Sequence, residues 1–300
     1  FGLFFLHGSV RAFYPPAQHA IIPNIVPTKM LPRAIALNAT IGKVFGTLGP
    51  VLAGYLITII DVYVYAVTAG LMIASTLAYL FLPKLTIAKI AGRSLEMLLG
   101  GISYVRSNSI VLGAIALDLF IMMMGAVVTL LPVYAADILN VGPEALGVMR
   151  GMPALGGVVV GMGLAALPPM RRSGLCLFIA LVIFSASITV FAVSTIYWVS
   201  LAALFVYGAT DMVSVNIRMI LIQLATPDHL RGRVSAVNAI FISSSNEMGD
   251  IRAGSVASLF GPVATVFIGS LMAFGVTMGG WYLFPKLRQL DRLTDVTPRN

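Results

Sequence analysis

Nine apolar windows, each long enough to cross a bilayer, follow one another along this chain of 300 residues and constrain its fold more than any other feature. A hydrocarbon core about 30 Å thick is crossed by a helix of roughly 20 apolar residues. A mean hydropathy of +0.97 and a charged fraction of 10% exclude an ordinary soluble domain, because about a quarter of the residues in such domains are charged. The sequence therefore predicts an all-α, polytopic membrane protein. The windows are residues 1–26, 34–60, 62–82, 110–136, 144–168, 174–194, 196–225, 234–258 and 260–284.

Lysine and arginine are unevenly distributed among the connections between these windows. Fourteen of the 19 lie in every second connection or in the C-terminal tail, and the other connections contain none. By the positive-inside rule, the basic connections and the C-terminus are predicted to be cytoplasmic, in a multi-pass protein of the plasma membrane, which here is the bacterial inner membrane. Topology and anionic headgroups also explain the net charge of +8, so no nucleic-acid partner is expected. These residues are Lys29, Arg33, Lys84, Lys89, Arg93, Arg106, Arg171, Arg172, Arg231, Arg233, Lys286, Arg288, Arg292 and Arg299.

The segment between the third and fourth windows has a different pattern. Its apolar residues Leu95, Leu98, Leu99, Ile102 and Val105 recur at helical spacing. This pattern predicts a short amphipathic helix that lies at the membrane interface within a cytoplasmic linker.

The chain also repeats itself at a distance of about 200 residues. PTKMLPRAIALNA at 27–39 is answered by PDHLRGRVSAVNA at 227–239, and YLFLPKL at 79–85 is answered by YLFPKL at 282–287. The first three windows and the last three are therefore copies of one unit. The two copies start an even number of windows apart and so on the same side of the membrane. The copies are therefore parallel, and parallel halves are an arrangement that transporters use.

If each half has six spans, the visible windows are spans 4 to 12, and spans 1 to 3 are expected upstream of Phe1. We therefore interpret the sequence as an N-terminally truncated twelve-span protein. The predicted domains are a partial N-terminal bundle at 1–83, a cytoplasmic amphipathic linker at 84–109, a C-terminal six-helix bundle at 110–285 and a cytoplasmic tail at 286–300.

Three stretches carry a resemblance to a known family. PAQHAIIPNIVPTKMLPRAIALNAT, GTLGPVLAGYL and the linker phrase GGISYVRSNSIVLGAI resemble the major facilitator superfamily, in the branch that contains the enterobactin exporter and macrolide-efflux-type proteins. The resemblance covers the whole chain and implies two pseudo-symmetric six-helix bundles that move a small molecule by alternating access. The stretch at 46–54 is similar to the family's antiporter motif, although Ala53 replaces one glycine; its matching residues are Gly46, Gly49, Pro50 and Gly54.

Charged residues within the apolar windows are the candidates for function, because a charge in hydrocarbon is expensive and normally faces a cavity or a partner. Spans 6, 9 and 12 have none in their interiors, which fits the lipid-facing positions that the resemblance implies for them. Asp211, Ser214 and Arg218 form one helical stripe. Their repeat counterparts are Arg11, Tyr14 and Gln18, and Lys43 is the counterpart of Ser243 at the start of the stripe that contains Glu247. We interpret Arg11, Tyr14, Gln18, Lys43, Ser214 and Arg218 as substrate-cavity or gating candidates.

Four acids are candidates for proton coupling. Glu247 and Asp250 lie about one turn apart on one face, where two carboxylates in a low dielectric do not readily ionise together. Asp211 and Asp118 lie in other windows. Fixed interhelical ion pairs or gates remain alternative roles for the charges. In the loops, Arg33, Arg231 and Arg233 set topology or hold an inner gate.

These features predict a proton-coupled exporter of a small amphipathic organic molecule, such as a siderophore or drug, that acts as a monomer. An importer or uniporter of the same fold remains an alternative, and a membrane enzyme or sensor is less favoured. The single cysteine and three histidines show no ligand spacing, so neither a metal nor a cofactor is expected, and no catalytic constellation indicates an enzyme.

Overall fold

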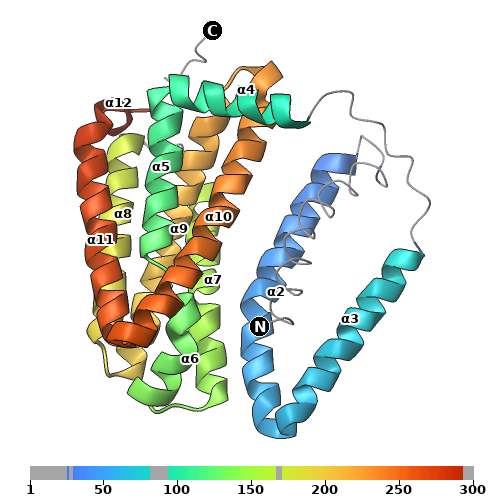
Figure 1. Ribbon diagram of the computed structural model, residues 1–300. Coiled ribbons are helices and arrows are strands. Elements are labelled where there is room, and N and C mark those ends of the chain that lie inside the picture. The colour runs from blue at the N-terminus through green and yellow to red at the C-terminus, as the bar shows by residue number, and fades with distance from the viewer. Residues whose placement is uncertain (1–25, 27–29, 82–93, 167–170, 293–300) are drawn as a thin grey trace. The chain divides into compact units, whose positions relative to one another are not determined.

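The computed structural model describes residues 26, 30–81, 94–166 and 171–292, and these are predominantly helical (Figure 1). They fall into two units: one contains residues up to Gly46 and Ile59–Ala91, and the other contains Thr47–Thr58 and the chain from Gly92 onward. The predicted span at 1–26, with Arg11, Tyr14 and Gln18, lies outside the described residues except for its last residue.

The N-terminal part consists of two long helices. Helix α2 (Leu31–Ile60) is followed by the short η2 (Asp61–Tyr63) and then by α3 (Val64–Leu80). Asp61, at the start of η2, has a positive φ of 47°, which interrupts the helical backbone between them. These helices match the predicted spans at 34–60 and 62–82 to within a few residues.

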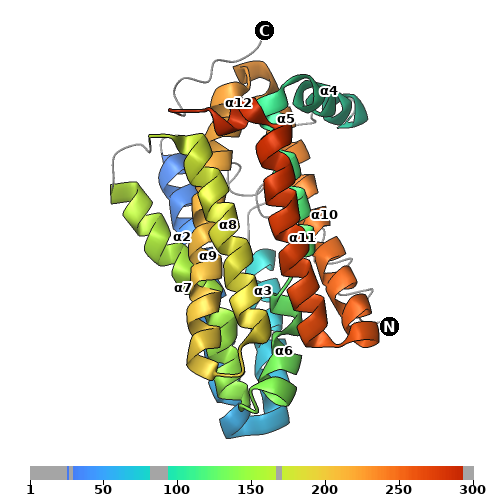
Figure 2. The same ribbon diagram turned by 90° about the vertical axis from the view of Figure 1, so that its left-hand side faces the viewer.

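The C-terminal unit is a bundle of long helices. Its members are α5 (Ser109–Met124), α7 (Pro143–Ala166), α8 (Ser173–Val193), α9 (Tyr197–Ala225), α10 (Asp228–Phe260) and α11 (Pro262–Leu283). The shorter α4 (Ser94–Ser107) lies across the end of the bundle where α12 (Pro285–Arg288) also lies, and α6 (Leu131–Val133) lies at the opposite end (Figures 1 and 2).

Local signals in the sequence set where these helices begin. Asn108 caps α5, because its side-chain oxygen accepts hydrogen bonds from the backbone N–H groups of Ile110 (3.1 Å) and Val111 (3.4 Å). Gly261, with φ of 80°, separates α10 from α11, which begins at Pro262. The same features that end one apolar window and start the next therefore position the helices.

Helices α7 and α9 approach each other through glycine. A Cβ at Gly208 would overlap the backbone carbonyl of Pro153, and a Cβ at Gly156 would overlap that of Phe205. Small residues allow such contacts between membrane helices, where dispersion and close packing replace the hydrophobic effect as the driving force. Gly157 lies in the same contact, since a Cβ there would lie 3.5 Å from the Gly208 carbonyl oxygen.

Within the described residues, six helical stretches are long and apolar enough to cross a membrane: Val44–Leu80, Ser109–Ile138, Pro143–Ala166, Ser173–Val193, Tyr197–Ala225 and Pro262–Leu283. The first combines two predicted windows. Helix α10 has the predicted position and length but is not among the six, because its charged side chains lower its hydropathy. The all-α, polytopic prediction is confirmed.

The predicted continuous span at 110–136 is interrupted. Helix α5 ends at Met124, and η3 (Val128–Leu130), α6 and the π-helical η4 (Tyr134–Ile138) follow. Gly125 and Pro132 explain the break, because glycine weakens a helix and proline removes a backbone donor and clashes with the preceding turn. The window is therefore one crossing built from several helical pieces.

Candidate functional site

An ion pair joins two helices inside the C-terminal bundle. The Arg218 guanidinium on α9 contacts the Asp118 carboxylate on α5, and the two side chains are only 4% and 6% exposed. Burying an unpaired charge among apolar helices has a large free-energy cost, and the pairing of the two groups lowers that cost for each. The sequence singled out both residues, for proton coupling and for the cavity, and the structure places them together.

A second group of polar residues involves α9, α10 and η3. Asp211 and Asp250 both lie within electrostatic reach of the Tyr207 phenol, and Thr129 donates a hydrogen bond to the Asp250 carboxylate. Tyr207 stacks on Phe184 with ring centroids 4.6 Å apart, which fixes the phenol. The structure thus brings two of the four proton-coupling candidates to one place.

Within this cluster the two acids differ in their partners. Asp250 accepts a hydrogen bond from the Thr129 hydroxyl, whereas Asp211 is half-buried on α9. A carboxylate among apolar helices loses its water, and a bound proton removes the penalty of keeping the charge there. Asp211 is therefore a candidate for proton uptake and release.

The break after α5 is held by residues of two other helices. Arg252 on α10 donates from Nε to the Met123 carbonyl at 2.9 Å and from Nη2 to the Met124 carbonyl at 2.6 Å. These carbonyls have no partner within α5 because the helix ends there. Gly249 and Gly269 leave room for the broken segment, since a Cβ at Gly269 would lie 2.5 Å from the Met124 carbonyl oxygen. Arg252 therefore makes a structural contact between α10 and the end of α5.

The remaining candidates on α9 and α10 occupy different surroundings. Ser214 is buried, in line with Asp211 and Arg218 on α9, whereas Glu247 is exposed on α10. The two acids that the sequence paired, Glu247 and Asp250, thus differ in their surroundings. Asp250 is half-buried and hydrogen-bonded, whereas Glu247 is exposed.

The antiporter-like motif lies on α2. Gly54 belongs with the second unit, where a Cβ on it would lie 2.6 Å from the Pro143 carbonyl oxygen and 3.0 Å from the Gly147 Cα. Gly46 and Gly49 have no described atom within 4 Å of the position that a Cβ would take, and Pro50 is half-buried. The side chains of Arg33 and Lys43 lie outside what the structure describes.

The linker helix α4 contacts the end of α9 and the start of α10. Arg231 and Arg233, which were predicted to lie in a loop, are in the first two turns of α10, because the helix begins at Asp228 directly after Pro227. The Tyr104 hydroxyl donates to the Ala225 carbonyl, and a Cβ at Gly101 would lie 2.9 Å from both the Arg233 carbonyl oxygen and the Val237 Cγ2. Arg231 donates from Nε to the Gln223 carbonyl at 3.1 Å. Arg233 therefore lies in the packing contact between α4 and α10. Helical spacing alone did not indicate this contact.

The close contact between α4 and α10 predicts that a larger side chain at Gly101 detaches α4 from α10. Gly101→Val is expected to increase protease cleavage within residues 94–107, because its side chain would push against the α10 backbone. Gly100→Ala is the matched control, since a Cβ there meets only the flexible end of the Arg233 side chain, at 3.3 Å. Equal cleavage of the two variants would contradict the close packing of α4 on α10.

The described residues place acidic side chains on several helices of the C-terminal bundle. Within them, no group of three or more His, Cys, Asp or Glu side chains is arranged to hold a metal ion. The polar groups lie instead singly or in pairs between long apolar helices, with Asp118, Asp211 and Asp250 on three different elements of one bundle. This is an arrangement of isolated charges whose state depends on neighbouring helices.

Comparisons with known proteins agree with this all-helical membrane architecture. The family model for the Major Facilitator Superfamily matches residues 1–249. The chain is similar to proteins named Enterobactin exporter EntS from Citrobacter koseri (23% identical over 281 residues), Salmonella choleraesuis (22% over 281 residues) and Shigella boydii (23% over 282 residues). Each match covers 93% of this chain and 67% of the relative. The chain therefore belongs to the major facilitator superfamily of membrane transporters.

Proposed function

We propose that this protein exports a small amphipathic organic molecule, a siderophore or drug, in exchange for protons by alternating access. The observation that carries the proposal is the half-buried Asp211, which, like Asp250, lies within electrostatic reach of the Tyr207 phenol inside a major facilitator bundle. The outward direction rests on the relatives that are named exporters over 93% of this chain.

Asp211 serves as the principal proton carrier in this proposal. Proton binding neutralises its carboxylate, which changes the penalty of enclosing it between helices and so favours one of the two access states. Asp118 acts differently, because its pair with Arg218 holds α5 to α9 and is broken only if those helices separate. Glu247 is exposed on α10 and is assigned a secondary role.

The location and orientation of the protein in the membrane are part of the same proposal. The protein lies in the bacterial inner membrane as a monomer, with the basic loops and the C-terminus in the cytoplasm. Support comes from the C-terminal unit, where α4, the α9–α10 junction and α12 lie at one end of the bundle and contain Arg106, Arg231 and Arg288 (Figures 1 and 2).

An importer or uniporter of the same superfamily is the alternative that uses the same helices. The alternatives differ from export by proton exchange in how transport depends on the proton gradient. A uniporter needs no gradient, and a symporter moves the proton and the substrate in the same direction.

A cell-based accumulation assay tests the proposal. Cells that produce the full-length protein are expected to retain less of a candidate compound than control cells, with enterobactin as the first compound because of the relatives' names. Collapse of the proton gradient with a protonophore is expected to abolish the difference, and Asp211→Asn is expected to behave as the control cells do.

The matched variant is Asp137→Asn, which removes an exposed carboxylate at the opposite end of the bundle from α4. It is expected to retain efflux. Efflux that persists without a proton gradient, or that survives Asp211→Asn, would rule out the proposed coupling.

A further inference from the structure

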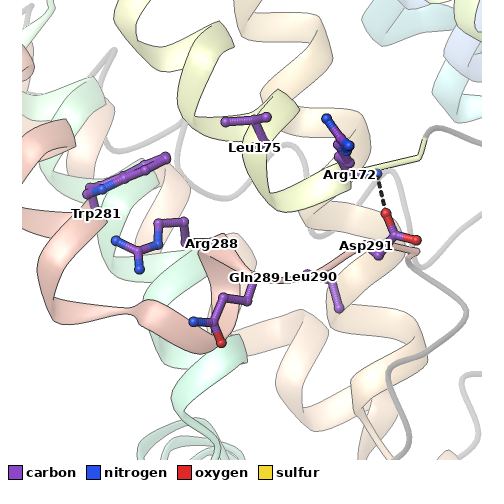
Figure 3. A pocket seen from close by; sticks show the side chains of 7 residues that line it. All are labelled: Arg172, Leu175, Trp281, Arg288, Gln289, Leu290 and Asp291. Carbon is purple, nitrogen blue, oxygen red and sulfur yellow. Dashed lines mark hydrogen bonds between the residues drawn. The ribbon is translucent and has the colours of Figure 1, made fainter.

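A pocket of about 360 Å³ opens where α8 begins and α11 ends, and this volume is within the range of about 300–1,000 Å³ that small-molecule sites occupy. Arg172, Leu175, Trp281 and Arg288 contribute to its lining, as Figure 3 shows. None of them belongs to the polar cluster around Asp211. The pocket is thus a separate feature of the C-terminal unit.

The chain that follows α11 forms one wall of this pocket and is tied to α8. The backbone N–H groups of Ser173 and Gly174 each donate, at 3.0 Å, to the carbonyls of Asp291 and Leu290. The Asp291 carboxylate accepts a third bond, from the Arg172 N–H at 3.2 Å (Figure 3). The wall is therefore built by specific hydrogen bonds.

Positive charge predominates around the pocket. The segments 171–174 and 285–292 contain five basic residues and one acid, which is Asp291. The Arg288 guanidinium carbon lies 4.9 Å from the centre of the Trp281 ring, a cation–π contact that holds this charge beside an aromatic face. A site of this kind favours an anionic group, and Arg suits phosphate because its planar fork can donate two parallel hydrogen bonds.

The position of the pocket relates it to the bilayer. Ser173 is the first residue of α8 and Trp281 lies in the last turn of α11, and both helices are long and apolar enough to span the membrane. Tryptophan and basic residues at the ends of spans lie at the level of the lipid headgroups. The pocket is therefore at the depth where a phospholipid carries its phosphate.

An apolar track leads away from the pocket along α8. Leu175, Ile179 and Ile183 are four residues apart and share one face of the helix. Ile179 and Ile183 are 49% and 42% exposed, so this face is open beside the charged rim. A soluble phosphate would use only the rim, whereas a phospholipid would use the rim and the track together.

We propose that this pocket binds the phosphate-bearing headgroup of an anionic phospholipid, whose acyl chain lies along the Leu175, Ile179 and Ile183 face of α8. The lipid joins the start of α8 to the end of α11 and to the C-terminal segment that follows. The proposal is independent of the transported substrate and of proton coupling.

Lipid titration of the delipidated, full-length protein by native mass spectrometry tests this site. Phosphatidylglycerol is expected to bind more tightly than phosphatidylcholine of the same chain composition. Arg172→Gln and Arg288→Gln are each expected to weaken phosphatidylglycerol binding about fivefold, and together about thirtyfold, since a basic residue near the surface contributes about this factor. Glycerol 3-phosphate, tested without lipid, is expected to bind far more weakly than phosphatidylglycerol.

Arg106→Gln removes an exposed charge from α4 and is expected to leave lipid binding unchanged. The Arg172→Lys and Arg288→Lys variants retain the charge and should keep most of the affinity; if the double glutamine variant does not fold, the single variants carry the test. Equal binding of the two lipids, or full phosphatidylglycerol binding by the folded glutamine variants, would overturn the proposal. Glycerol 3-phosphate binding as tight as that of phosphatidylglycerol would replace the lipid with a soluble phosphate.

Discussion

Asp118→Asn is expected to destabilise the C-terminal bundle by about 3–5 kcal/mol, because it leaves the buried charge of Arg218 without its partner. The guanidinium is 4% exposed and lies between α5 and α9, where water does not replace the lost carboxylate. Thermal unfolding of the purified protein in detergent measures the effect, with the exposed Asp137→Asn as the reference. Arg218→Met should be similarly damaging, since it leaves Asp118 unpaired.

The double variant distinguishes a specific pair from general sensitivity of the site. Replacing both Asp118 and Arg218 with leucine removes both charges, so its stability should exceed that of either single variant. Single variants that unfold at the temperature of the wild type, or losses that simply add in the double variant, would show that the two charges do not depend on each other.

Gly208→Ala is expected to give the second large effect, by forcing α7 away from α9. The new Cβ would overlap the Pro153 carbonyl, and its nearest neighbours are backbone atoms that cannot rotate away. Overpacking of this kind typically costs about 1–3 kcal/mol, and a contact with backbone belongs at the upper end. Gly156→Ala should behave alike, because it meets the Phe205 carbonyl from the other helix.

Gly163→Ala is the matched control for this prediction. It makes the same substitution on α7, at a position with no described atom within 4 Å of the new Cβ. The higher helix propensity of alanine should leave it as stable as the wild type or slightly more stable. If Gly208→Ala and Gly163→Ala unfold at the same temperature, the close approach of α7 and α9 is wrong.

Hydropathy predicted most of the fold because a chain within hydrocarbon must satisfy its backbone hydrogen bonds internally, and helices do so. The windows that became α8, α9 and α11 needed no further information. The break after Met124 was missed because the window at 110–136 is apolar throughout, and hydropathy does not report backbone strain. Gly125 and Pro132 were the available signals.

The sequence predicted most residues of the candidate site, but it did not predict which of them contact each other. The rule that intramembrane charges are functional selected Asp118, Arg218 and Asp211. Helical spacing relates residues on one helix only, so it could not pair Asp118 with Arg218 from another helix. Tyr207 was missed, although it lies one turn before Asp211 on the same face. Thr129 gave no such signal, because its contact with Asp250 depends on the broken backbone after α5.

Proton movement in proteoliposomes tests the central claim most directly. The full-length protein is reconstituted with a pH-sensitive dye inside the vesicles, and the candidate substrate is added on one side in the absence of a pH gradient. Proton-coupled export predicts substrate-dependent proton flow in the direction opposite to the substrate, present in Asp137→Asn and absent in Asp211→Asn. Substrate transport without proton flow, or with protons moving in the same direction, would contradict the account.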